Sequence, residues 1–185
     1  DAVVKDPTRR PGRPRKAPSP EDVLIIVSKV HQDYEDIQHG MVFEAFEDIP
    51  GVRVQTVDRN LARMVPGIVG TGPEGPTDDA LKRATKEGRR WLTELNADLL
   101  VWSSVNETGR SIHVRFVALA SSPGERPGRF RPHHYLTVPV DFYNDWVPLI
   151  RSVALSAFDP RSIAQGRILR SALPSIAGAA RSLGL

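Results

Sequence analysis

Cysteine is absent from all 185 residues of the chain. Disulfide bonds, thiolate zinc sites, iron–sulfur clusters and cysteine nucleophiles are therefore excluded within this sequence. A lack of cysteine is typical of proteins from reducing compartments. We therefore expect a cytoplasmic protein.

Long hydrophobic runs are also missing. No apolar stretch approaches the roughly 18 to 20 residues that cross a bilayer, and the charged, proline-rich start has no apolar segment of a signal peptide. The chain begins at Asp1 rather than methionine, which is consistent with a piece of a larger protein. With 40% hydrophobic and 25% charged residues, the composition is that of an ordinary globular domain.

The whole chain has a net charge of only +3, and the excess of positive charge is concentrated in its N-terminal segment. Residues 1–21 contain repeated prolines and no apolar periodicity, so they are predicted to form a basic, disordered leader. Its five clustered cations are Arg9, Arg10, Arg13, Arg15 and Lys16.

Residues 22–158 show the alternating pattern of an α/β domain. Strands are predicted at 23–27, 52–57, 99–105, 111–119 and 135–140, with helices at 38–48 and 77–96. This β-α-β-α-β-β order predicts a mixed sheet in two or three layers, with parallel pairing of the first three strands. Ser111, His113, Arg115 and Val117 alternate with apolar residues, which predicts that they line the less buried face of the second hairpin strand.

The C-terminal part is predicted to be helical. Asp145 is a suitable N-cap for a helix with Pro148 in its first turn, and Asp159 with Pro160 restarts a helix. Residues 159–185 are interpreted as a C-terminal helical extension, in which Pro174 interrupts the helix.

A Gly- and Pro-rich segment at 61–76 is predicted to be irregular. Its Gly70, Gly72 and Gly75 match the spacing G-x-G-x-x-G, which is typical of dinucleotide-binding loops. The strand before it is short and broken, and the helix starts only after Pro76. A loop is the preferred interpretation, and nucleotide binding is an alternative.

The stretch 88–102, GRRWLTELNADLLVW, is followed by a turn with Gly109 and a strand from Ile112 to Leu119. In this order of helix, strand and hairpin, residues 22–158 resemble the TolB N-terminal-domain-like module of bacterial signalling proteins. The sequence departs from that pattern at Ser103, where the family usually has glycine. The resemblance implies a module that positions partners without catalysis, and no catalytic residues are carried over.

No catalytic constellation emerges from the residue pattern. Ser103 and Ser104 follow an apolar strand without a base tied to them, and no G-x-S-x-G motif occurs. His113, His133 and His134 lack the spacing of a metal site. An acidic cluster after the first strand could hold a divalent cation, although a solvated loop is preferred; it comprises His31, Asp33, Glu35 and Asp36. No enzyme activity, metal or cofactor is predicted.

Three functions remain as hypotheses. The first is a non-catalytic interaction or scaffold module of a larger bacterial regulatory protein, which binds a protein partner or another copy of itself. The second is a DNA-associated protein, because the leader sequence Arg10-Pro11-Gly12-Arg13-Pro14 resembles an AT-hook, although Pro11 replaces one groove arginine. The third is nucleotide binding by the glycine-rich loop.

The DNA hypothesis predicts that replacing Arg13 and Arg15 with Ala weakens binding to A·T-rich duplex DNA. The dependence of log affinity on log salt should become shallower by about 0.9 for each phosphate that the leader no longer neutralises. Filter binding over a salt series measures both quantities, and an unchanged affinity contradicts the hypothesis.

Overall fold

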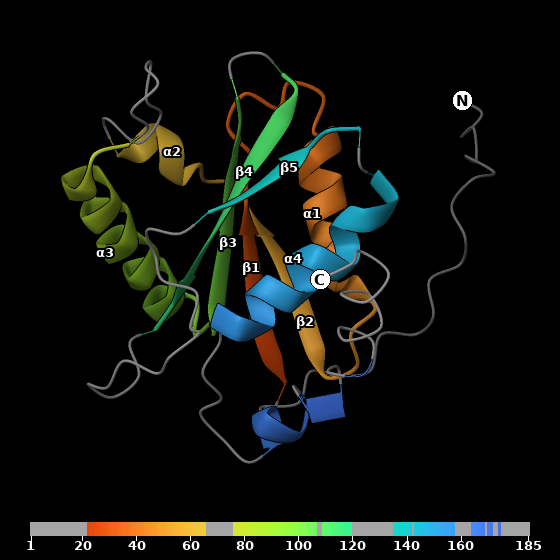
Figure 1. The fold of residues 1–185 in the computed structure, drawn as a ribbon. Coiled ribbons are helices and arrows are strands. Elements are labelled where there is room, and N and C mark those ends of the chain that lie inside the picture. The colour runs from red at the N-terminus through yellow and green to blue at the C-terminus, as the bar shows by residue number, and fades with distance from the viewer. Residues whose placement is uncertain are drawn as a thin grey trace, which may run out of the picture.

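Five strands form one mixed β-sheet in the order β2-β1-β3-β4-β5 (Figure 1). This computed structural model describes residues 22–65, 76–106, 109–119, 135–141, 143–157, 164–168, 170, 171 and 174. The elements are β1 (Val23–Ser28), α1 (Ile37–Glu47), β2 (Val52–Val57), α2 (Leu61–Met64), α3 (Asp78–Glu94), β3 (Leu99–Val105), β4 (Ser111–Ala118), β5 (Leu136–Pro139) and α4 (Tyr143–Ala157). The predicted α/β class is confirmed.

Strand β1 lies inside the sheet and is buried along its whole length. It pairs in parallel with β2 on one side and β3 on the other, so that Ile25 lies between Val54 and Leu99. A continuous run of β-branched and other apolar residues suits a strand that is covered on both faces. The predicted parallel pairing of the first three strands is therefore confirmed.

Helices cover both faces of the sheet and make three layers (Figure 1). Val23, Ile25 and Val27 face α1 and α4, whereas Leu24 and Ile26 face α2 and α3. This division follows from the alternation of side chains along a strand. Each face of the sheet thus has its own apolar core.

Helix α3 begins as the sequence predicts. The Thr77 hydroxyl accepts a hydrogen bond from the Ala80 N–H at 3.3 Å, and Asp78 and Asp79 lie in the first turn. A side-chain oxygen at the N-cap and acidic residues beside it both stabilise the positive end of a helix.

The prediction that 61–76 is irregular throughout is wrong for its first residues, which form α2. The Asn60 side chain accepts a hydrogen bond from Arg63 N–H and caps this short helix. Leu61 and Ala62 are buried against the α3 side of the sheet. Burial of these two side chains supplies the stabilisation that the local pattern does not reveal.

The predicted hairpin of β3 and β4 is confirmed, but the less buried face predicted for β4 is correct only for its first half. Ser111 and His113 are partly exposed, whereas Arg115 and Val117 are 2% and 1% exposed. Gly88 of helix α3 approaches Val117 and Leu100 closely. Contacts with a distant helix therefore bury this end of β4.

Helix α4 starts earlier than predicted. It begins at Tyr143, so Asp145 is not its N-cap and Pro148 lies beyond the first turn. Ile150, Ala154 and Ala157 are buried in the core that α4 shares with α1. Burial of this apolar face outweighs the loss of one backbone hydrogen bond at the proline.

The described part of the predicted C-terminal extension packs against the domain. Gln165 Nε2 donates to Asp98 Oδ1 at 3.3 Å, and Asp98 Oδ2 accepts from the Leu24 N–H at 2.8 Å. Ile168 lies against Gly51, which has a positive φ of 76°. None of the described helices is long and apolar enough to cross a membrane.

Two helical glycines offer a matched test of the packing on the α3 face. A Cβ at Gly88 would lie 2.9 Å from Leu100 Cδ2, whereas a Cβ at Gly40 in α1 meets nothing within 4 Å. Gly88→Ala should lower the free energy of unfolding by about 0.5–2 kcal/mol, because overpacking exceeds the gain in helix propensity. Gly40→Ala should raise it by about 0.5–1 kcal/mol.

Urea unfolding of both variants measures these changes. Equal stabilisation by the two substitutions would show that α3 does not pack closely on β3 and β4.

Candidate functional site

The carboxyl ends of β1 and β3 mark the point where the strand order reverses. The chain leaves β1 for β2 on one side and later returns to β3 on the other side. Open α/β sheets bind ligands in the crevice outside such a pair of strands. Here His31 N–H donates to Ser103 O at 3.0 Å, and Val105 N–H donates to His31 O at 2.9 Å. Backbone pairing with β3 therefore continues beyond the end of β1.

Further hydrogen bonds join the ends of β1 and β2. Lys29 N–H donates to Arg59 O at 3.0 Å. The His39 ring lies across the two strands, with Nδ1 3.2 Å from Ser28 O and Nε2 3.3 Å from Thr56 Oγ1. These partners assign the proton to Nδ1, which donates to the carbonyl, while Nε2 accepts from the hydroxyl. Both ring nitrogens of His39 thus hold the strands together.

The loop between β1 and α1 has an unusual backbone. Gln32 and Asp36 have φ angles of 62° and 55°, in the left-handed region that non-glycine residues seldom adopt. The Asp33 carboxylate accepts the His39 N–H at 2.7 Å and so satisfies a free amide in the first turn of α1. Such a conformation costs about 1–3 kcal/mol for each residue and persists where the surroundings determine it.

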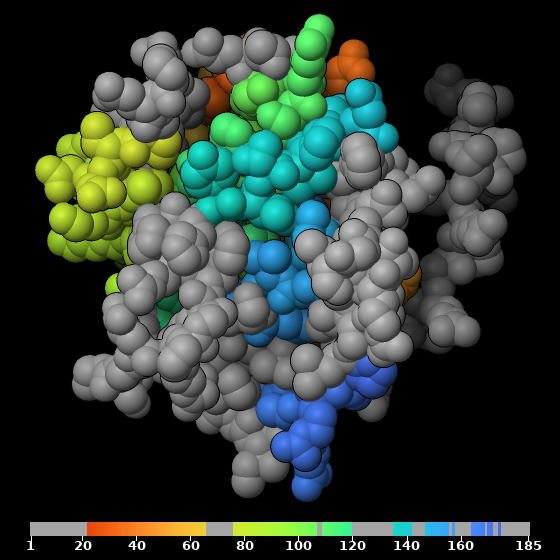
Figure 2. Space-filling view, viewed as in Figure 1, coloured from red at the N-terminus to blue at the C-terminus, as the bar shows by residue number. Residues whose placement is uncertain are grey.

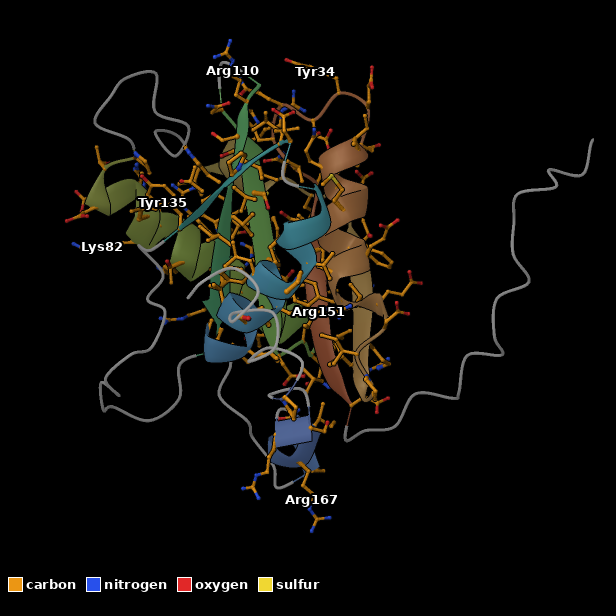
Figure 3. All side chains as sticks on the ribbon, turned by 45° about the vertical axis from the view of Figure 1, so that its right-hand side comes forward. Tyr34, Lys82, Arg110, Tyr135, Arg151 and Arg167 are labelled. Carbon is orange, nitrogen blue, oxygen red and sulfur yellow. The ribbon has the colours of Figure 1, made fainter. Side chains whose placement is uncertain are left out.

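This loop places apolar side chains in solvent. Tyr34 is 93% exposed and Ile37 is 51% exposed. Figure 3 shows Tyr34 at the same end of the molecule as Arg110, which belongs to the turn before β4. We refer to Tyr34 and Ile37 together as the β1–α1 surface.

The acidic residues of the same loop do not form a cation site. Among the described residues, no group of three or more histidine and acidic side chains is arranged to hold a metal ion. The Asp33 carboxylate is engaged by the His39 amide. The hypothesis of a divalent cation bound by His31, Asp33, Glu35 and Asp36 therefore receives no support from the geometry.

A second feature lies on the α2/α3 face, where Arg115 is buried between two aromatic rings. Its guanidinium carbon is 5.0 Å from the centre of the Trp102 ring and 4.7 Å from that of Tyr135. Trp102 is the cross-strand partner of Arg115 on β3, and Tyr135 directly precedes β5 on the other side of β4. The rings therefore cover the guanidinium from opposite sides.

Hydrogen-bond donors of this cluster lack acceptors. In the described part of the chain, neither Arg115 Nε nor Trp102 Nε1 has a hydrogen-bond partner, although both atoms are buried. No carboxylate there forms an ion pair with Arg115. Buried donors and buried charges are usually paired in folded proteins, so this arrangement requires an explanation.

The cluster has one positive charge at neutral pH. Burial lowers the pKa of Arg115 to about 10, with Tyr135 acting in the opposite direction, so the guanidinium stays protonated. The His113 ring lies 4.9 Å from the Tyr135 ring. Burial first, and the charge of Arg115 second, lower the pKa of His113 below its ordinary value of 6.5. His113 is therefore neutral at pH 7.

Arg115 was not predicted as a site residue, because the alternating pattern placed it on a half-exposed face. The sequence contained one indication that Arg115 is buried. Arg115 stands in an apolar run, VRFVAL, and this strand pairs with one that contains Trp102. An arginine between Val114 and Phe116, opposite a tryptophan, is compatible with burial between aromatic rings.

Other predicted sites lie outside the described residues. These are the basic leader, with Arg9, Arg10, Arg13, Arg15 and Lys16, and the glycine-rich motif, with Gly70, Gly72 and Gly75. The same holds for His133 and His134. DNA binding by the leader and nucleotide binding by the loop stay predictions.

Comparison with known protein families and with curated proteins finds no match for this chain.

The environment of His113 predicts a pH dependence. Because its pKa is lowered in the folded state, its contribution to stability is complete above pH 6.5 and is lost as pH falls through the folded pKa. NMR titration of the imidazole Cε1–H should give a midpoint below 6.5. His113→Gln identifies the signal and should reduce the loss of stability between pH 7 and 5. A midpoint at or above 6.5 would contradict the burial of this ring.

Proposed function

We propose that this domain is a non-catalytic interaction module, which binds a protein partner or a second copy of itself through the β1–α1 surface. The observation that supports it most directly is the exposure of Tyr34, which is 93%, in a loop with an anchored backbone. Because the Tyr34 side chain is so exposed, it adds little to the stability of the fold. A contact between this side chain and another molecule would give the strained loop a function.

The chemistry of the exposed residues suits a protein interface. Tyrosine has a large amphipathic surface and few rotatable bonds, so it loses little entropy when it is immobilised. Tyrosine and arginine are enriched among the residues that dominate binding energies. Ile37, three residues after Tyr34, is half-exposed, and Arg110 lies at the same end of the molecule as Tyr34 (Figure 3).

The hydrogen bonds of the carboxyl edge support a role other than catalysis. A general base needs a free position toward substrate, but both ring nitrogens of His39 are engaged within the domain. The backbone of His31 pairs with β3 beyond the end of β1. These groups maintain the shape of the edge from which Tyr34 projects.

The resemblance to TolB N-terminal-domain-like modules extends this proposal. It suggests that the domain belongs to a larger bacterial regulatory protein, in which it positions a partner. The full sequence of the gene product would test the proposed regulatory context. A neighbouring catalytic domain, with no signalling or scaffold domain in the same protein, would contradict it.

Site-specific photocrosslinking tests the proposed surface. Tyr34 is replaced by benzoylphenylalanine, which keeps an aromatic ring, and cross-linked products from the cells of origin are identified by mass spectrometry. Lys82 on α3, with a side chain 78% exposed, is the control position. We expect position 34 to cross-link to one protein, or to another copy of this chain, several times more efficiently than position 82.

The double variant Tyr34→Ala, Ile37→Ala provides the matched binding control. Its unfolding free energy should stay within about 0.5 kcal/mol of the wild type for each exposed side chain, whereas the cross-linked complex or the dimer in sedimentation experiments should diminish. Equal cross-linking at positions 34 and 82 would refute the proposed surface.

A further inference from the structure

The cluster around Arg115 contains a buried positive charge and two buried donors that the described residues leave without acceptors. Arg115 and Trp102 are each 2% exposed. They are cross-strand partners, and the guanidinium carbon lies 5.0 Å from the indole ring centre. A buried guanidinium without a carboxylate partner favours an acceptor with two oxygen atoms and negative charge.

The charge of the cluster indicates a monoanion. Arg115 is protonated, and His113 is neutral at pH 7 because burial and the arginine lower its pKa. A dianion would retain one negative charge without compensation in a buried position, which is strongly unfavourable. A singly charged acceptor balances the guanidinium.

The geometry indicates a planar acceptor. Trp102 and Tyr135 cover the guanidinium from opposite sides, which leaves hydrogen bonding to its in-plane edge. Nε belongs to that edge. A carboxylate lies in the plane of the guanidinium and binds such an edge through two parallel hydrogen bonds. A tetrahedral oxyanion would direct oxygens toward the rings above and below.

Access to the cluster passes Tyr135, which is 48% exposed while the arginine is 2% exposed. Figure 2 shows β5, which follows Tyr135, at the surface next to α3, and Figure 3 shows Tyr135 on the α3 side of β5. Rotation of this one ring would open the guanidinium to a small molecule. A side chain on the surface of a protein partner could not enter so far.

From this arrangement we infer that Arg115 binds the carboxylate of a small organic acid between the rings of Trp102 and Tyr135, with Tyr135 at the entrance. Arg115 would hold the carboxylate through Nε and a terminal nitrogen, and the Trp102 ring would cover one face of the pair. This site lies on the α2/α3 face and goes beyond the proposed function, since it shares no residue with the β1–α1 surface.

Calorimetry and thermal unfolding with sodium acetate and sodium benzoate test the inference, with sodium chloride and phosphate at matched ionic strength. We expect saturable binding and a rise in melting temperature with a carboxylate, because a ligand of the folded state stabilises it. Chloride and phosphate should cause at most a weak, non-saturating change. An acetyl-Gly-Glu-Gly-amide peptide distinguishes a protein carboxylate from a free acid and should not bind.

Three variants and a control locate the site. Arg115→Met should abolish carboxylate binding, and Arg115→Lys, which keeps the charge but not the planar edge, should weaken it at least about tenfold. Trp102→Phe keeps an aromatic ring over the guanidinium and should preserve binding. Arg53→Met at the β2 edge of the sheet removes a half-exposed arginine and should leave binding unchanged.

A direct signal keeps the test decisive if an Arg115 variant does not fold. In the wild-type protein, the Nε–Hε resonance of Arg115 should shift on addition of benzoate, and sodium chloride at matched ionic strength should not shift it. The inference is overturned if no carboxylate binds saturably, if folded Arg115→Met binds as well as the wild type, or if the resonance does not move. Binding of the peptide but not of acetate would refute the free acid as the ligand.

Discussion

The rest of the structure depends on the burial of β1 on both faces and along both edges. Its backbone pairs with β2 and β3, while its side chains alternate between the two apolar cores. A strand in this position must be apolar at every residue, and the sequence VLIIVS satisfies this until Ser28. Helices then have to cover both faces, which explains why α1 and α4 lie on one side and α2 and α3 on the other.

The same strand determines the character of the carboxyl edge. Beyond Ser28 the chain continues toward β3 and pairs with it through His31, and Lys29 binds the end of β2. Other α/β sheets bind ligands at the carboxyl ends of their strands, and here main-chain hydrogen bonds continue into that region. The loop that follows has to turn sharply into α1, with left-handed residues at Gln32 and Asp36, and this turn places Tyr34 in solvent.

Much of the fold followed from local pattern. The parallel pairing of the first three strands, the start of α3 beside Thr77 and the hairpin of β3 and β4 were all predicted from the order of residues. Errors occurred where distant packing overrides local preference. Residues 61–64 form α2 because two of their side chains are buried, and α4 accommodates Pro148 because its apolar face joins α1.

The candidate sites were less predictable than the fold. Exposure of Tyr34 depends on the path of a loop, and the surroundings of Arg115 depend on Trp102 and Tyr135, which lie on either side of it. By itself, the sequence determined the α/β class, the parallel core and the absence of thiol chemistry, since these follow from composition and from periodicity along one strand or helix. Only the tertiary structure decided that Arg115 and Val117 on β4 are buried. The reason is that burial depends on neighbours from other elements: α3 packs on Val117, and the chain on either side of β4 places Trp102 and Tyr135 around Arg115.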